Sequence, residues 1–313
     1  MNYFRTILAL FFLLAIVSCQ TKKKDSRTDT YTSGVIPISV DESFQPIIQD
    51  ELDVFESQFP KAGIVPKFTN EVEAINDILR DSVELAIVTR PLSAKELKYM
   101  ADKKFCPRNY KLATDGIALI INKHNLDSLI TVDQIRKILL GEITEWKQIF
   151  PASHLGKIIT VFDNPNSSTV RFAIDSICNG KPLSKSLTAL NTNPEVVKYV
   201  NKTPNAIGVI GVNWLSNRKD TTNLTFNDEV RVMSVTDEVS ANIDNSYKPY
   251  QAYLFYGYYP LVRNLYIILN DPRGALASGL TSFLTSDRGQ RIILKSGLVP
   301  ATQPVRIVSV KSE

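Results

Sequence analysis

The chain has 313 residues, 44% of them hydrophobic, which is enough apolar material for two domains with cores of their own. Its formal net charge is only +4, with Lys and Arg scattered along the sequence, so nothing in the composition indicates a nucleic-acid-binding protein. The two histidines and three cysteines form no Cys-x-x-Cys motif and no mixed cluster. We therefore expect neither a metal site nor a cofactor.

The N-terminal segment has the pattern of a bacterial export signal. Its apolar run at residues 7–17 is too short to cross a bilayer as a mature helix. The motif that follows at residues 16–19, Ile-Val-Ser-Cys, resembles the bacterial lipobox, which implies cleavage before Cys19 and attachment of lipid to it. We predict a lipoprotein signal peptide at 1–19 and a flexible polar tether at 20–34. Ordinary secretion with a chance cysteine is the alternative.

Strands and helices are then predicted to alternate. We expect strands at residues 35–39, 64–68 and 84–88, and helices at 44–59, at 71–80 and from about residue 94. Ser43 is placed to cap the first of these helices, and Thr89 and Arg90 follow the third strand directly. In open α/β sheets ligands gather beyond the carboxyl ends of the strands, so Arg90 stands where a binding crevice is expected.

The middle and end of the chain continue the α/β pattern. A nearly continuous apolar run predicts a strand at 115–122 that is buried on both faces. Further elements are a helix from Thr131 to Gly141, a helix from Asn193, strands at 206–211 and 261–269, and two closing helices, the last from about Ser286. Residues 218–250 are polar and irregular, and we predict no site in them.

Residues 158–174 form a strand, a tight turn and a helix. The β-branched run stops at Asn-Pro-Asn, residues 164–166, before helical spacing begins. Ser167, Ser168 and Thr169 therefore stand at a helix N-terminus, where backbone N–H groups lack intrahelical partners and the helix dipole is positive. Such an end attracts an oxyanion, although an ordinary helix cap explains the same residues.

Several short pieces, in this order, resemble the PstS-like phosphate-binding solute receptors of ABC transporters, a group of type II periplasmic binding proteins. They are Ser43-Phe44 with Pro46, Thr89 to Ser93, Asp115 to Ala118, Gly141 to Trp146, Asn166 to Thr169, Ala206 to Gly208, Tyr259 to Arg263, and Ser286 to Gln290 with Gly297 to Pro300. The resemblance implies an α/β fold with two lobes joined by a two-strand hinge. Lobe I would combine residues 35–114 with 259–313, and lobe II would comprise 115–258.

The resemblance also implies that a dehydrated phosphate is clamped between the lobes. Carried over position by position, the ligand-binding residues are Ser43, Phe44, Thr89, Arg90, Asn166, Ser167, Ser168 and Thr169. Arg90 is the expected main source of positive charge. For Arg171 two interpretations stay open. It contacts the ligand, or it is an exposed helix residue, since helical spacing from Thr169 turns it away from the cap.

Three departures from the family pattern oppose phosphate binding. Asn166 and Ser168 replace both glycines of the family's Gly-Ser-Gly-Thr loop, which makes close backbone approach to a ligand harder. Asp163 lies near a position where many members carry arginine, and Glu71 and Glu73 bring carboxylates close to the proposed cleft. A dehydrated carboxylate facing a phosphate opposes binding by several kcal/mol.

The sequence thus predicts a membrane-anchored lipoprotein of the bacterial cell envelope, facing the periplasm or the exterior, and not an enzyme. It would capture phosphate or a similar oxyanion and deliver it to an ABC transporter permease. The alternative is an envelope interaction or scaffold protein on the same fold that has lost small-anion binding. A third hypothesis is a hydrolase using Ser167 or Ser168, but neither serine lies in a G-x-S-x-G motif and neither histidine has a recognisable partner context.

Overall fold

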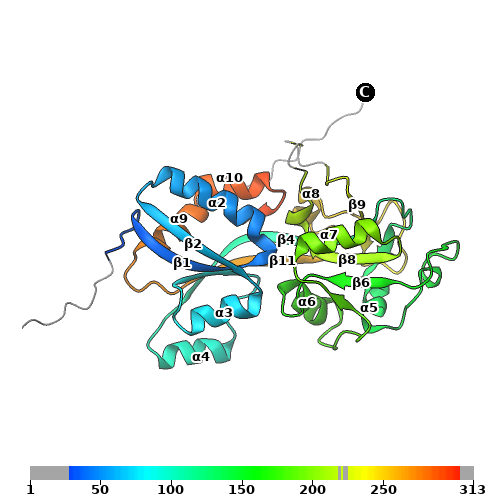
Figure 1. Cartoon of the computed structure of the whole chain (residues 1–313), viewed down its shortest axis with the longest axis horizontal. Coiled ribbons are helices and arrows are strands. Elements are labelled where there is room, and N and C mark those ends of the chain that lie inside the picture. The colour runs from blue at the N-terminus through cyan, green and yellow to red at the C-terminus, as the bar shows by residue number, and fades with distance from the viewer. Residues whose placement is uncertain (1–27, 218–219, 221–224, 304–313) are drawn as a thin grey trace, which may run out of the picture.

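The computed structural model describes residues 28–217, 220 and 225–303. Two groups of elements lie side by side, and two long strands run between them, β4 (Arg108–Asn122) and β11 (Val262–Leu269) (Figure 1). We call the group that contains β1 to β3 lobe I and the group that contains β5 to β10 lobe II. Within the described ranges, no helix has the length and apolar character needed to cross a membrane. The predicted signal peptide and Cys19 lie outside the described residues.

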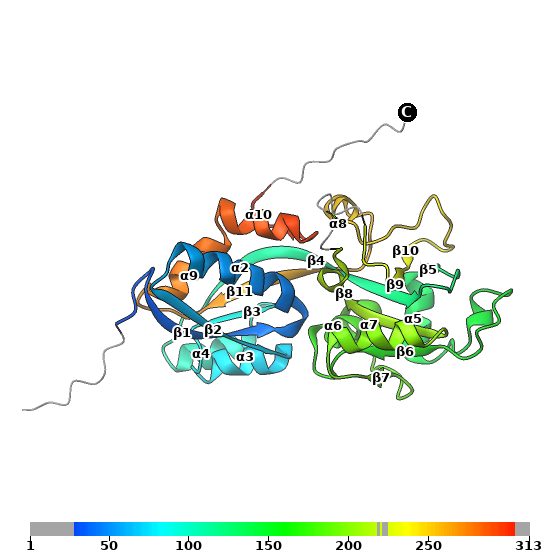
Figure 2. The same ribbon diagram turned by 45° about the horizontal axis from the view of Figure 1, so that its top comes forward.

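Lobe I is a sheet covered by helices on both faces. Its strands follow the order β2-β1-β3-β11-β4, in which β1 (Gly34–Asp41) is parallel to β2 (Ala62–Thr69) and β3 (Leu85–Val88), and β11 is antiparallel to β3 and β4. One face carries α2 (Gln45–Gln58), α9 (Leu276–Leu284) and α10 (Asp287–Lys295), and the other carries α3 (Glu71–Leu79) and α4 (Ala94–Asp102) (Figures 1 and 2). The parallel strands end toward lobe II, so the loops after them meet the other lobe.

Lobe II continues the same sheet through the second half of β4. Its strands are β8 (Ala206–Gly211), β6 (Ile159–Phe162), β7 (Thr188–Ala189) and β9 (Val230–Val232). Its helices are α5 (Val132–Leu140), α6 (Ser168–Phe172), which continues as a π-helical turn at Ala173–Ile177, α7 (Asn193–Lys202) and α8 (Gln251–Tyr256). The remaining strands are β5 (Leu129–Thr131), β10 (Ser234–Thr236) and β12 (Val299–Pro300), of which β12 pairs with the lobe I part of β4. The expectation that 218–250 is irregular throughout was wrong, because β9 and β10 lie within it.

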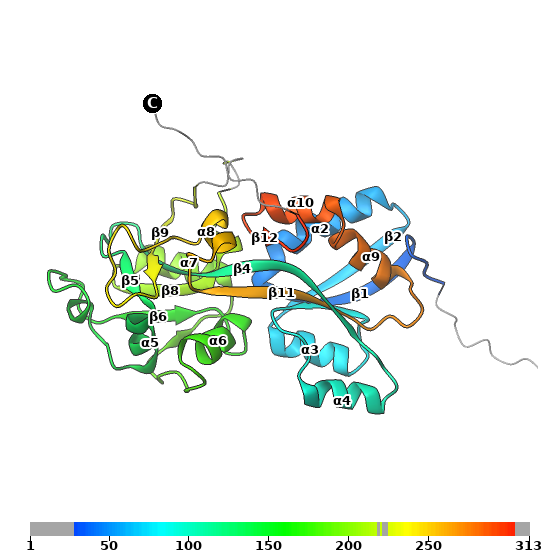
Figure 3. The ribbon, with the colours of Figure 1, turned by 180° about the vertical axis from the view of Figure 1, so that it is seen from behind.

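Strand β4 changes partner where the lobes meet. Its residues up to Gly116 pair with β11, and Ile117 to Ile121 pair with β8 (Figure 3). The strand begins seven residues before the predicted limit of 115, because its first part mixes polar and apolar residues without a regular pattern and shows no continuous apolar run. A two-lobed α/β arrangement joined by two strands was predicted and is observed, while the limits 35–114 with 259–313 for lobe I and 115–258 for lobe II stay a prediction.

Candidate functional site

The end of strand β1 forms a buried turn at the boundary between the lobes. The Asp41 carboxylate accepts a hydrogen bond from the backbone N–H of Ser43 at 3.0 Å and thereby caps the 3₁₀ turn Glu42–Phe44. Ser43 and Phe44 are both fully buried. From lobe II, Asn213 donates to the carbonyl of Ser43 at 2.5 Å, and the hydroxyl of Ser168 lies 3.3 Å from that of Ser43. Ser43 is therefore a contact point between the lobes.

The opposite side of this contact is the N-terminus of α6. Ser167 is its N-cap, as predicted, with its hydroxyl accepting from Val170 N at 3.2 Å and donating to Asp163 at 2.6 Å. Ser168 and Thr169 are buried, and the Thr169 hydroxyl has no hydrogen-bond partner among the described residues. Asn166, in contrast, is exposed. Of the four residues expected on this loop, the three with hydroxyl groups are buried. Asn166 lies at the exposed edge of the contact between the lobes, which we call the rim.

Arg263 brings a positive charge to the same place from hinge strand β11. Its Nε donates to Asp115 at 3.0 Å, and a terminal nitrogen donates to the Ser168 hydroxyl at 2.7 Å. The guanidinium carbon lies 4.9 Å from the centre of the Phe44 ring, a cation–π contact. The other terminal nitrogen is buried and has no hydrogen-bond partner in the described part of the chain. We call Ser43, Phe44, Ser168 and Arg263 the seam.

A glycine makes room for this arginine. A Cβ atom at Gly211 would lie 3.0 Å from the unpaired Arg263 nitrogen and 3.3 Å from the Asp115 carboxylate. Sequence reasoning placed Arg263 in a family-like piece but did not choose it as a site residue. A partial signal was present, because Arg263 and Asp115 each interrupt an apolar strand. The structure then pairs them, since they lie directly opposite each other in the sheet.

A second set of contacts crosses between the lobes at Glu71, which follows the N-cap of α3. One oxygen of this buried carboxylate accepts from the backbone N–H of Thr89 at 2.8 Å and from its hydroxyl at 2.6 Å. The other accepts from Arg171 Nε of lobe II at 2.5 Å. Burial alone would raise the pKa of Glu71, but the bonds from Arg171 and Thr89 hold it below its ordinary value. We call these three residues the Glu71 cluster.

Arg90 is turned toward its own helix. Both terminal nitrogens bind Glu96, at 2.8 and 2.9 Å, and one also donates to the carbonyl of Pro91. Glu96 in turn completes the capping box of α4 with Ser93. The expectation that Arg90 supplies the main charge for a ligand is therefore weakened, because its guanidinium is already paired bidentately.

Further carboxyl groups lie near the seam. Burial raises the pKa of Asp41 to about 6, against the charge of Arg263 and with added repulsion from Glu71. Burial likewise raises the pKa values of Asp115 and Asp163, and Asp163 also accepts from Asn193 at 3.2 Å. Because their pKa values are raised, these carboxyl groups take up protons at a higher pH than usual, which lowers the negative charge near the seam. In the described ranges, no group of three or more His, Cys, Asp or Glu side chains is arranged to hold a metal ion.

Glu73 was expected near the cleft together with Glu71, but it lies on the outer surface. It pairs there with Lys67 at 3.4 Å and Arg80 at 3.3 Å. Helical geometry explains the difference, because residues two apart on a helix point in different directions.

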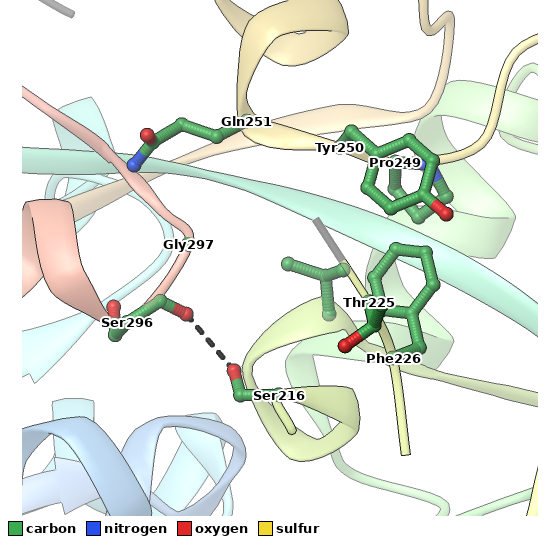
Figure 4. A pocket seen from close by; sticks show the side chains of 9 residues that line it. Ser216, Thr225, Phe226, Pro249, Tyr250, Gln251, Ser296 and Gly297 are labelled. Atoms are coloured by element: carbon green, nitrogen blue, oxygen red, sulfur yellow. Dashed lines mark hydrogen bonds between the residues drawn. The ribbon is translucent and has the colours of Figure 1, made fainter. Parts of the chain in front are cut away.

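The pocket in Figure 4 lies beside the hinge. It is lined by Ser216 and Gln251 of lobe II and by Ser296 of lobe I, among others, and Ser216 donates to the Ser296 carbonyl at 2.9 Å. Gln251 donates to the carbonyls of Leu294 and Leu298. The cavity volume of about 20 Å³ holds roughly one water molecule, so this pocket joins the lobes and is too small for a solute.

Comparison with known proteins places this geometry in a family. A family model described as a PBP superfamily domain matches residues 25–288. The phosphate-binding protein PstS of Staphylococcus saprophyticus is 25% identical over 205 residues, which are 65% of this chain and 60% of that protein. PstS of Staphylococcus aureus strain USA300 is 25% identical over 213 residues, 66% of this chain and 61% of that protein. The chain thus spans about three fifths of the length of these curated relatives.

Solved structures share the architecture. A putative phosphate ABC transporter substrate-binding protein with bound phosphate from Clostridium perfringens superposes with a TM-score of 0.70 at 21% identity, covering 86% of this chain and all of that one. An ABC-type phosphate transport receptor from Vibrio cholerae gives a TM-score of 0.64 at 20% identity, covering 85% of this chain and all of that one. The predicted two-lobed type II fold with a two-strand hinge is confirmed.

Proposed function

This chain belongs to the PBP superfamily, in its PstS-like group, and we propose that it is a solute-binding protein that captures phosphate or a similar oxyanion between its lobes for an ABC transporter permease. The supporting observation is the seam. There the buried Arg263 keeps one terminal nitrogen unpaired while the other donates to the Ser168 hydroxyl, which lies 3.3 Å from that of Ser43. The Thr169 hydroxyl, next along α6, is also buried and unpaired in the described part of the chain. A buried donor without a partner costs free energy, and an oxyanion placed between the lobes removes that cost.

The proposed contacts use both lobes. Arg263 and Thr169 donate to the anion, and the unpaired oxygen of Asp41 accepts from a protonated phosphate oxygen. Because Ser43 and Ser168 contact each other directly, the ligand enters after the lobes separate about β4 and β11. We assign the larger share of charge to Arg263, with Ser43, Phe44, Thr89, Ser167 and Ser168 as surrounding contacts and Arg90 and Asn166 at the rim.

Titration calorimetry of the purified protein against phosphate, sulfate and arsenate tests the proposal. We expect heat with phosphate and arsenate, which both retain a proton at neutral pH, and a weaker signal with sulfate, which has no proton to offer Asp41. No heat and no thermal shift at millimolar phosphate, for the wild type and for Glu71→Gln alike, would reject phosphate binding.

We further propose that the protein is a lipoprotein held at the membrane of the bacterial envelope through Cys19. Cys19→Ala should give an unprocessed or soluble form with an unchanged unfolding transition, because the first strand, β1, begins only at Gly34. The predicted tether at 20–34 is not flexible throughout, since Asp29 pairs with Arg273 and Tyr31 bonds Ser282 of α9. Membrane flotation and labelling with a radioactive fatty acid measure the effect. Retention of the Cys19→Ala protein at the membrane after its signal segment is cleaved would contradict the anchor.

One observation favours the second candidate, an interaction or scaffold protein. Glu71 and Arg171 already join the lobes by an ion pair, with no ligand needed to bridge them. A two-lobed protein that is closed in this way presents one fixed surface. The phosphate titration separates the two candidates, because a scaffold gives no heat.

A further inference from the structure

We propose that Thr89 and Arg171 form an oxyanion subsite whose resident ligand is the chain's own Glu71 carboxylate, so that Glu71 competes with any small oxyanion entering between the lobes. The inference rests on the proposed function only for the nature of the entering ligand. The subsite itself is inferred from the contacts that Glu71 makes with Thr89 and Arg171. Its ligand class is a small carboxylate or a tetrahedral oxyanion.

The donors around Glu71 are those of an anion site. Thr89 offers a backbone N–H at 2.8 Å and a hydroxyl at 2.6 Å, and Arg171 offers Nε at 2.5 Å. A terminal nitrogen of Arg171 also donates to the Thr89 hydroxyl at 2.7 Å, which fixes the orientation in which that hydroxyl donates to Glu71. Charge-assisted bonds of this kind recognise carboxylates and other oxyanions without distinguishing their source.

The subsite is assembled from both lobes. Thr89 follows β3 in lobe I, and Arg171 lies in α6 of lobe II, three residues beyond the Ser168 hydroxyl that Arg263 binds. An anion at the seam that also takes bonds from Thr89 or Arg171 therefore has to displace Glu71 from these donors. The Glu71 side chain is only 2% exposed, so its carboxylate has lost nearly all of its water and its bonds replace that water.

The Glu71 carboxylate, the proposed competitor, stays charged at neutral pH. The bonds from Arg171 and Thr89 hold the pKa of Glu71 below its ordinary value despite burial. Arg90 does not offer a ready replacement for Arg171, because its two terminal nitrogens bind Glu96. Displacing Glu71 therefore leaves a carboxylate without its partners, and phosphate affinity is lower than the same scaffold would otherwise give.

The experiment removes the Glu71 carboxylate from the subsite and supplies a small carboxylate from solution in its place. Glu71→Ala protein should show a rise in Tm with millimolar acetate or formate, whereas the wild type and Glu73→Ala should not respond. Glu73 is the matched control, since it lies on the same helix and pairs outside with Lys67 and Arg80. Adding Arg171→Met to Glu71→Ala should abolish the acetate response. A Glu71→Ala protein that is folded and unaffected by acetate and formate would overturn the subsite.

Phosphate titrations complete the test. Phosphate should bind Glu71→Ala at least tenfold more tightly than the wild type, and Glu73→Ala should match the wild type. If Glu71→Ala fails to fold, Glu71→Gln keeps the shape of the side chain, and its phosphate affinity should also exceed that of the wild type. Wild-type phosphate binding that neither variant strengthens overturns the competition and leaves the proposed function standing. An acetate response without phosphate binding by any variant supports the subsite and rejects phosphate as the ligand.

Discussion

At pH 7 a Glu51→Gln variant should be more stable than the wild type by about 3 kcal/mol in free energy of unfolding, and the two should be nearly equal near pH 4.5. Glu51 lies on α2 and is fully buried, and neither carboxyl oxygen has a hydrogen-bond partner among the residues that the structure describes. Burial, with some repulsion from Asp50, raises its pKa to about 9. The folded protein therefore holds this carboxyl protonated where the unfolded chain ionises it.

The sign follows from that difference. Between the ordinary pKa of 4.5 and the folded value of about 9, the folded state binds more protons at Glu51 than the unfolded state does. Stability is then lost as pH rises through this window, by up to about 1.4 kcal/mol for each pH unit. An amide of similar size is neutral in both states and removes the dependence.

Urea unfolding at pH 4.5, 6, 7 and 8 measures the effect. Asp53→Asn is the control on the same helix, because Asp53 is exposed and its change should leave the shape of the pH profile as it is in the wild type. Parallel profiles for the wild type and Glu51→Gln would show that this carboxyl is ionised or solvated in the folded protein.

Much of the fold follows from local sequence patterns that mark where a helix begins or ends. The capping box that starts at Thr131 and the left-handed Gly141 bound α5 as predicted, and Ser93 and Ser286 stand at predicted helix starts. These signals are read within four residues along the chain. The prediction that Ser43 caps the first helix was wrong, because Ser43 lies inside the 3₁₀ turn Glu42–Phe44 and Phe44 is the N-cap of α2. The short strands β9 and β10 were missed because each has only three residues and depends on partners about 100 residues away in sequence.

The site was predicted less completely because its charges are set by contacts distant in sequence. Arg90 has the position expected of a ligand-binding residue, yet Glu96, six residues later, takes its guanidinium. Arg171 was left undecided by helical spacing, and its orientation depends on Glu71, 100 residues earlier. Arg263 is matched by Asp115, 148 residues away. A pattern confined to one segment cannot give the partner of a charged side chain, and the partner decides which charges remain available.

If phosphate binds at the seam, Arg263→Ala should weaken binding by about 2 to 5 kcal/mol, because a dehydrated anion loses its buried charged partner. Arg90→Ala should cost under about 1 kcal/mol, since Arg90 is about a third exposed and pairs with Glu96. Thr169→Ala should cost about 1 kcal/mol, the loss of one neutral hydrogen bond. Titration calorimetry with phosphate gives all three values, and the ranking is the test.

Arg263→Ala leaves Asp115 buried without its ion-pair partner, at a cost of about 3 to 5 kcal/mol in stability. A loss of binding could then reflect unfolding, so a second variant is needed. Combining it with Asp115→Asn removes the orphaned charge, and Asp115→Asn alone is the reference for binding. The double variant should be folded by circular dichroism and still bind phosphate far more weakly than Asp115→Asn. Should Arg90→Ala lose more affinity than Arg263→Ala, the anion lies at the rim near α4, and the unpaired nitrogen of Arg263 serves the hinge alone.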